Sequence, residues 1–186
     1  MTQSAVLTDP VYTIGHSTRT IAEFGALLGE SAIQLVADVR AIPRSRTNPQ
    51  FNLDVLPGSL KEFGIGYQHF PELGGRHRHP RGAAPSPNTF WHNESFRNYA
   101  DYAATDAFSV GFVRLRDLAA GKRCAIMCSE AVWWRCHRRI ISDYLLAHGI
   151  PVMHIMGTGK VDAATLTPNA HKVSDGTLVY RSQDGA

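Results

Sequence analysis

The sequence has little cysteine, little lysine and no long apolar run, and each shortage excludes a class of protein. Its 186 residues include 3 cysteines, an odd number confined to positions 124–136, which does not fit the disulfide framework of a small secreted protein. No apolar stretch approaches the roughly 20 residues that a membrane-spanning helix needs. The first ten residues lack the basic start and apolar stretch of a signal peptide. We therefore expect a cytoplasmic protein with reduced thiols and no membrane partner.

Arginine supplies most of the positive charge. Nineteen Lys+Arg against 16 Asp+Glu give a formal net charge of +3, which is too mild by itself to indicate a polyanionic partner. Lysine occurs only at positions 61, 122, 160 and 172. The other cations are arginine, whose planar fork suits phosphates and carboxylates. A GC-rich genome would produce the same bias, so the composition leaves both explanations open.

Short apolar runs alternate with segments of helical periodicity, a pattern typical of β-α units on a largely parallel sheet. The predicted strands are 11–14, 34–39, 66–70, 124–128 and 151–156. The first predicted helix begins at Thr20, with Glu23 at capping-box spacing. The other predicted helices cover 58–63, 95–120 with a break near Thr105, and 134–148. We expect one α/β domain over 1–186, with a mostly parallel sheet of about five strands in a core over 11–156. An irregular extension follows over 157–186, ending in a strand-like piece at 177–180.

Two segments between the predicted elements lack regular periodicity. Residues 40–49 are polar and contain two prolines, and residues 73–94 are rich in glycine, proline, arginine and histidine. So long a structureless stretch is usually a functional loop or a disordered one. From Arg40 to Arg81, cations outnumber carboxylates and alternate with aromatic and histidine side chains. This composition favours a surface that binds nucleotides or single strands, and a pair of solvated loops is the plainer interpretation.

Polar clusters follow the carboxyl ends of four predicted strands, at 15–17, 40–46, 74–75 and 128–130. Because parallel strands share a direction, these loops meet at one edge of the sheet, where ligands bind in open α/β folds. Arginine forks and backbone N–H groups there would hold phosphate. The residues expected to contact the ligand are Gly15, Ser17, Thr18, Arg19, Arg40, Arg44, Ser45, Arg46, Tyr67, Gly74, Gly75, Arg76, Trp134 and Arg138.

Five residues are candidates for the chemistry. Glu130 or Asp38 would act as the acid–base group, with His16 or His137 as its partner. The apolar neighbours of Glu130 favour a raised pKa, and a salt bridge to Arg138 is the alternative interpretation.

Cys128 is the fifth candidate, because it precedes a strand-to-helix turn whose electric field lowers the pKa of a thiol. Its alternative role is that of a small buried apolar residue. A rhodanese-like or phosphatase-like loop would use it as a nucleophile. Six residues separate Cys128 from Arg135, one more than in a cysteine phosphatase loop, and two tryptophans stand where glycines usually occur.

Zinc is disfavoured, and no metal or other cofactor is predicted. Within one strand, Cys124 and Cys128 lie roughly 13 Å apart at about 3.3 Å per residue. Tetrahedral zinc, with bonds of about 2.3 Å, holds two sulfurs within roughly 4 Å of each other. Cys128, Cys136 and His137 would converge only if the intervening loop folded back, and no fourth ligand is evident.

Four ordered motifs resemble the bacterial family of domain of unknown function 488. They are TIGHS at 13–17, DVR at 38–40 with Pro43, Ser45 and Arg46 after it, LGGR at 73–76, and MCSE at 127–130 with WRCHR at 134–138. The resemblance runs from about Tyr12 to about Tyr180, although the family often has alanine where Ser129 stands. It implies an α/β protein with no assigned reaction, so no catalytic residue follows from it.

The sequence therefore favours a cytosolic enzyme, a hydrolase or a transferase, that binds a phosphorylated small molecule or a nucleic acid at the carboxyl edge of the sheet. Thiol chemistry at Cys128 is the second hypothesis. The third is a module without enzymatic activity that binds nucleic acid through its arginine-rich loops.

Overall fold

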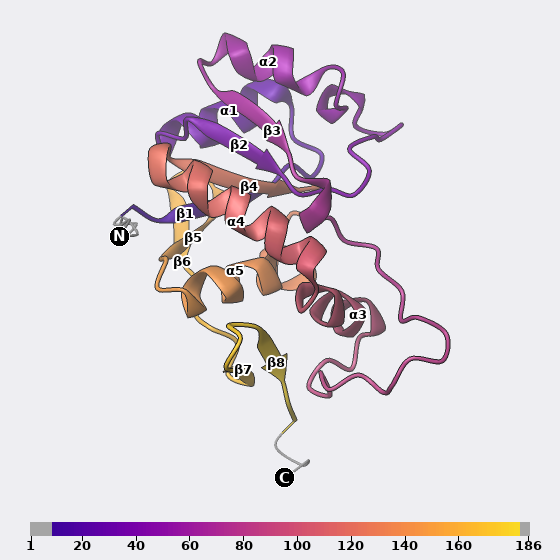
Figure 1. The fold of residues 1–186 in the computed structure, drawn as a ribbon. Helices are drawn as coiled ribbons and strands as arrows, with labels where there is room; N and C mark the ends of the chain where they lie inside the picture. The colour runs from indigo at the N-terminus through magenta and orange to yellow at the C-terminus, as the bar shows by residue number, and fades with distance from the viewer. Residues whose placement is uncertain (1–8, 183–186) are drawn as a thin grey trace.

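The computed structural model describes residues 9–182, and a six-stranded sheet lies at its centre (Figure 1). The strand order is β3-β2-β4-β1-β5-β6. The strands are β1 (Val11–Gly15), β2 (Leu35–Asp38), β3 (Gly66–His69), β4 (Cys124–Cys128), β5 (Val152–Gly157) and β6 (Lys160–Ala163). The first five are parallel to their neighbours and β6 runs antiparallel to β5. The predicted α/β fold with a mostly parallel sheet is confirmed.

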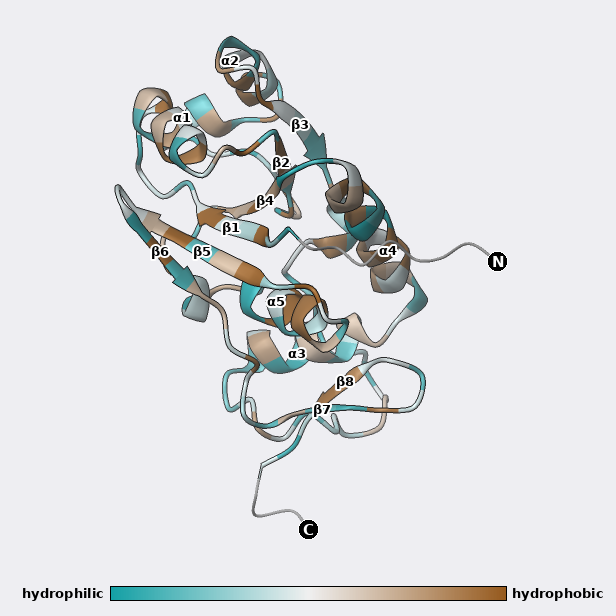
Figure 2. Ribbon diagram, turned by 90° about the vertical axis from the view of Figure 1, so that its left-hand side faces the viewer, coloured by the Kyte–Doolittle hydropathy of each residue, from teal (hydrophilic) through white to brown (hydrophobic). Residues whose placement is uncertain are grey.

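Helices cover both faces of this sheet (Figure 2). On one face, α1 (Ile21–Glu30) and α2 (Leu56–Glu62) pack into one hydrophobic cluster. On the other face, α4 (Asp106–Gly121) and α5 (Arg138–Ala147) form a second cluster, and α3 (Glu94–Ala103) packs against both of these helices. The molecule is thus a helix–sheet–helix sandwich with two separate cores.

The central strand β4 shows why the apolar runs form this sheet. All five of its residues are buried. Ile126 belongs to the cluster of α4 and α5, whereas Ala125 and Met127 belong to the cluster of α1 and α2. A strand buried on both faces has no polar alternation, so it reads as a continuous apolar run. Its predicted bounds agree with the structure.

The predicted starts of two helices agree with the structure, and in both a side chain caps the helix. Thr20 and Glu23 form the expected capping box on α1, and the Oγ1 atom of Thr105 accepts a hydrogen bond from the backbone N–H of Phe108 at the start of α4. The prediction for α5 was wrong at its start. Residues Trp133–Arg135 form a 3₁₀ turn and Cys136 is extended, so α5 begins at Arg138 instead of Trp134.

The extension after β5 is more regular than predicted. It contributes β6 to the sheet and then forms a hairpin of β7 (Ala170–Lys172) and β8 (Leu178–Tyr180). Two further 3₁₀ turns lie at Pro49–Phe51 and Pro71–Leu73, and 74–93 contain neither helix nor strand, as predicted. Within 9–182, no helix has the length and apolar character needed to cross a bilayer.

The direction in which the chain leaves the sheet changes between β1 and β4. These two strands are neighbours, yet β1 leads into α1 on one face of the sheet and β4 leads into α5 on the other. Beyond the carboxyl edge, the chain therefore continues from these two strands to opposite faces of the sheet. Such a switch in direction is where open α/β sheets bind ligands.

Candidate functional site

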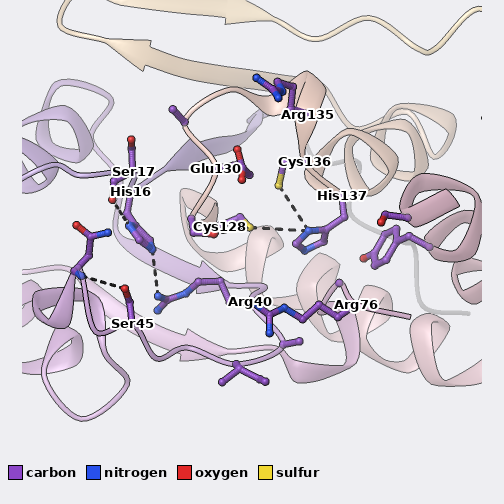
Figure 3. A pocket seen from close by; sticks show the side chains of 18 of the residues that line it. His16, Ser17, Arg40, Ser45, Arg76, Cys128, Glu130, Arg135, Cys136 and His137 are labelled. Atoms are coloured by element: carbon purple, nitrogen blue, oxygen red, sulfur yellow. Dashed lines mark hydrogen bonds between the residues drawn. The ribbon is translucent and has the colours of Figure 1, made fainter. Parts of the chain in front are cut away.

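A cavity of about 740 Å³ lies at this carboxyl edge (Figure 3). Its walls come from the loops after β1, β2 and β4, from 75–77 of the loop after β3, and from three side chains of α3. All four segments predicted to converge thus contribute to one cavity. A volume of roughly 300–1,000 Å³ is typical of small-molecule sites.

The charge on the cavity wall is strongly positive. Four arginines line it, Arg40, Arg44, Arg76 and Arg135, and Glu130 is the single carboxylate among the lining residues that the structure describes. Arg44, Arg76 and Arg135 are exposed and form no ion pair within 9–182. Their guanidinium groups are therefore available to an anion.

Arg40 is held differently, by a buried network around Asp38. The Nε atom of Arg40 donates to Oδ1 of Asp38 at 2.9 Å and its NH2 group donates to Oδ2 at 2.6 Å, while the hydroxyl of Tyr67 donates to the same Oδ2 at 2.6 Å. Burial, followed by the charge of Asp38, raises the pKa of Tyr67. Asp38 and Tyr67 do not line the cavity. Their contacts suit the positioning of Arg40 better than acid–base exchange with a ligand.

His16 lies on the cavity wall, stacked on the ring of Phe51 at 4.2 Å. Its Nδ1 atom is 2.8 Å from the carbonyl oxygen of Ser17. A carbonyl only accepts, so Nδ1 carries the proton and Nε2 is left to accept from Arg40 at 3.3 Å. Burial lowers the pKa of His16 to about 4. His16 is thus a neutral acceptor that helps to orient Arg40, and its lone pair is already engaged.

The loops after β1 and β4 are joined by backbone hydrogen bonds. The N–H of His16 donates to the carbonyl of Cys128 and that of Ser17 donates to Ser129, both at 2.9 Å. The two loops approach so closely that a Cβ atom on Gly15 would lie 1.8 Å from the carbonyl oxygen of Glu130. These N–H groups were expected to hold phosphate. The N–H groups of His16, Ser17 and Arg19 are occupied within the protein, so they are not free to hold phosphate.

Two residues on the cavity wall adopt left-handed backbone conformations. Ser17 has φ 51° and Arg76 has φ 71°, and neither is glycine. Such residues cost about 1 to 3 kcal/mol each and gather at binding sites. One of the two, Arg76, also carries an exposed guanidinium group.

Three potential ligand atoms meet on the floor of the cavity (Figure 3). The Nδ1 atom of His137 lies 3.9 Å from Sγ of Cys128 and 3.6 Å from Sγ of Cys136. The hydrogen bond with Cys136, followed by burial, raises the pKa of Cys128 to about 12. Burial opposes ionisation of Cys136, but the hydrogen bond from Cys128 and the charge of Arg138 outweigh it and lower the pKa to about 6. The acidic thiol of the pair is Cys136, whereas the sequence pointed to Cys128.

Arg138 is buried, with 1% of its surface exposed, and does not line the cavity. Its NH2 group donates to the backbone carbonyl of Glu130 at 2.6 Å, and its Nε donates to Sγ of Cys136 at 3.4 Å. The alternative salt bridge between Glu130 and Arg138 is therefore replaced by a contact to the main chain. The Glu130 side chain is exposed on the cavity wall instead of lying in an apolar neighbourhood.

Several predicted ligand contacts lie outside the cavity. Arg19 donates to the carbonyls of Gly15 and Met156, Trp134 packs edge-on against Trp133, and Gly74 faces Ala41. Arg46 is exposed but is not among the lining residues. The cavity does include the predicted Ser17, Thr18, Ser45 and Gly75.

Sequence reasoning missed the contribution of α3. Ser95, Phe96 and Tyr99 line the cavity, although their helical spacing predicted only a core face. Cys136 and Arg135 were considered, for a zinc site and for a phosphatase-like loop, but were not among the predicted site residues. The signal that could have included them is their position directly before His137. The periodicity of α3 does not indicate that this helix, which is distant in sequence from the loops after β1 and β2, forms one wall of the cavity.

Comparison with family models agrees with the resemblance seen in the motifs. The model described as Domain of unknown function DUF488 matches residues 20–145. The match covers more than half of the chain and includes the loops after β2, β3 and β4, while the loop after β1 lies before it. Comparisons with curated proteins and with solved structures gave no match. The chain belongs to the DUF488 family.

Proposed function

We propose that this protein is an enzyme that binds a phosphate-bearing ligand, of the size of a nucleotide, in the cavity at the carboxyl edge of the sheet. The observation that carries the proposal is the charge of the wall: three exposed arginines without an ion pair among the described residues, a fourth paired with Asp38, and one carboxylate surround about 740 Å³. Exposed guanidinium groups on several loops can bind one phosphate from several sides, in the bidentate geometry that arginine favours.

Ring side chains on one wall support a nucleotide in particular. Phe96 and His77 line the cavity beside the arginines. The ring of His77 is held against Tyr102 by stacking at 3.5 Å, and its Nε2 donates to the carbonyl of Gly74 at 2.8 Å. A base can stack on such fixed rings while arginines hold its phosphate.

The reaction class follows from the groups that can move a proton. Glu130 is exposed on the wall and free of an ion pair among the described residues, so its carboxylate can act as the acid–base group for hydrolysis or transfer of a phosphate ester. Asp38 and His16 are engaged by Arg40 and serve to position that side chain.

Calorimetric titration with inorganic phosphate and with AMP tests the binding. We expect Arg44→Ala and Arg76→Ala each to weaken AMP binding by about 10-fold to 100-fold, the loss of hydrogen bonds to a charged group. Lys122→Ala is the matched control, because it removes an exposed cation next to the amino end of β4, at the opposite edge of the sheet. Equal losses in all three variants, or no binding of either probe to wild type, would contradict the proposal.

Turnover separates an enzyme from a binding module. A panel of nucleotides and sugar phosphates should contain a compound that wild type converts and Glu130→Gln does not, with AMP affinity retained in the variant. Binding of a single-stranded oligonucleotide that weakens steeply with salt, without turnover of any compound, would favour the nucleic-acid-binding alternative instead.

A further inference from the structure

The three atoms on the cavity floor are arranged as the ligands of a small metal ion. Nδ1 of His137 and the Sγ atoms of Cys128 and Cys136 all lie within 4.8 Å of one another. Zinc bonds of about 2.3 Å to sulfur and about 2.0–2.1 Å to nitrogen, at tetrahedral angles, place such ligand atoms roughly 3.5–4 Å apart. The two nitrogen–sulfur distances, 3.6 and 3.9 Å, already fall in this range.

The imidazole of His137 is oriented for ligation. Its Nε2 atom lies 2.9 Å from the backbone carbonyl oxygen of Val39, which can only accept, so the proton is on Nε2 and the lone pair is on Nδ1. That lone pair faces both sulfurs (Figure 3). A ligating histidine commonly donates its other N–H to a carbonyl in this way.

The sulfur of Cys136 is held by donors that suit a thiolate ligand. The backbone N–H and the Nε atom of Arg138 donate to Sγ at 3.5 and 3.4 Å. Arg138 is buried and has no carboxylate partner within 9–182. A thiolate at Cys136 provides the negative charge that this buried guanidinium otherwise lacks.

The backbone explains how these residues meet despite the distance argument from the sequence. That argument holds for Cys124, which lies at the other end of β4. After β4, the 3₁₀ turn at Trp133–Arg135 and the extended Cys136 return the chain to the strand end. The loop therefore does fold back, and it brings Cys136 and His137 to Cys128.

We propose that Cys128, Cys136 and His137 bind a zinc ion whose fourth coordination position opens into the cavity. Two thiolates and an imidazole are soft donors that favour zinc over magnesium or calcium. Three protein ligands with one open position are the pattern of catalytic zinc sites, whereas structural sites have four. All three residues line the cavity, so water or an oxygen of a bound ligand can take the fourth position.

The charge of the site is compatible with its arginine-rich surroundings. Two thiolates cancel the charge of the divalent ion, so the loaded site adds little positive charge to the wall. A bound zinc would polarise a phosphoryl or carbonyl oxygen, or activate a water molecule. The zinc site goes beyond the phosphate-binding proposal, and its test does not depend on that proposal.

The experiment measures zinc binding directly on the reduced full-length protein. Elemental analysis after dialysis against Zn²⁺ should give one ion per chain, and competition with a chromogenic chelator should give the affinity. Replacement of Zn²⁺ by Co²⁺ should produce the intense visible bands of a tetrahedral site together with a thiolate-to-cobalt charge-transfer band. X-ray absorption of the zinc form should show sulfur at about 2.3 Å and nitrogen or oxygen at about 2.0–2.1 Å.

Cysteine variants locate the ion. Cys128→Ser, Cys136→Ser and His137→Gln should each weaken zinc binding by at least about 10-fold, a loss typical of disrupted metal sites. Cys124→Ser is the matched control, because it removes another buried thiol of β4 and should bind zinc as wild type does. Circular dichroism identifies any variant that fails to fold. Where a variant does not fold, alkylation of the wild-type thiols is measured with and without Zn²⁺ instead, and bound zinc should protect them.

Three outcomes would overturn the zinc site. In the first, wild type binds no more zinc than Cys136→Ser. In the second, Cys124→Ser loses zinc as fully as Cys128→Ser. In the third, the mass of the purified chain stays lower by two hydrogens under reducing conditions, because a Cys128–Cys136 disulfide persists and excludes the metal. AMP affinity is measured in parallel. Absence of zinc binding would therefore leave the phosphate-binding proposal standing, and absence of AMP binding would leave the zinc site standing.

Discussion

At the scale of single residues, the buried histidine on β5 has no role in the cavity but affects stability. The Nδ1 atom of His154 is 2.8 Å from Oγ1 of Thr13, and the ring stacks on Trp133 at 4.4 Å. Its Nε2 has no hydrogen-bond partner within the described part of the chain. Burial, and then the charge of Arg138, lowers the pKa of His154 to about 4. The folded protein therefore holds this side chain in its neutral form.

This histidine should make stability depend on pH. Between its unfolded pKa of about 6.5 and about 4, the unfolded chain binds a proton that the folded chain does not, so the free energy of unfolding falls as the pH falls. The slope is at most about 1.4 kcal/mol per pH unit for one group, and His16 adds a similar contribution. Urea unfolding of His154→Phe between pH 4 and 7 should show a flatter profile than wild type. His92→Phe, at an exposed position, should leave the slope unchanged, and a parallel slope for His154→Phe would refute the assignment.

At the scale of elements, the junction of the β1 and β4 loops depends on a glycine. A Cβ atom on Gly15 would meet backbone atoms of Glu130 and Ala131, the nearest at 1.8 Å. Backbone cannot yield as a flexible side chain can. The substitution Gly15→Ala must therefore separate the two loops.

We expect Gly15→Ala to destabilise the fold by about 3 kcal/mol or more, the range of overpacked and strained sites, and to weaken zinc and AMP binding together. Chemical denaturation and the two binding assays measure these effects. Gly29→Ala in α1 is the control, since a Cβ atom there meets nothing within 4 Å and alanine favours helix by up to about 1 kcal/mol. If Gly15→Ala were as stable as wild type, the close contact of the loops would be wrong.

The strands and helices differ in how well the sequence predicts them. β4 was predicted with its bounds because both of its faces are buried, and the four site loops were predicted because parallel strands end at one edge. The strand β6 was missed because all four of its residues are exposed, which leaves no apolar pattern. The start of α5 was wrong because Cys136, Ile140 and Tyr144 follow helical spacing whether or not Cys136 is in the helix. No local sequence pattern predicts that the loop after β4 folds back to the end of that strand. The approach of Cys136 and His137 to Cys128 is therefore visible only in the three-dimensional structure.

At the scale of the whole molecule, the extension after β5 is part of the fold. Tyr180 is fully buried. Its hydroxyl donates to Asp143 of α5 at 3.0 Å, and its carbonyl accepts from the backbone N–H of Phe90 at 3.1 Å. Its own N–H donates to Oδ1 of Asn88 at 2.9 Å. One residue thus connects the tail, α5 and the long loop before α3.

Removal of this side chain should loosen all three segments. Tyr180→Ala should lower the free energy of unfolding by about 3 to 5 kcal/mol, as for other large aromatic truncations in a core, and should raise protease cleavage within 74–93. Val179→Ala, on the other face of β8, should cost less than about 1.5 kcal/mol. Urea titration and limited proteolysis compare the two variants. A similar small effect for both would mean that the tail merely rests on the surface.

The placement of α1 and α5 on opposite faces of the sheet has a consequence for how a bound molecule would act on the protein. The cavity touches loops that lead into α1 on one core and into α5 on the other. An occupant adds contacts to both layers, beyond the hydrogen bonds that already join the β1 and β4 loops, and its binding free energy opposes the separate opening of either layer. When the cavity is occupied, the amide protons of α1 and of α5 should therefore both exchange with solvent more slowly, and by similar factors.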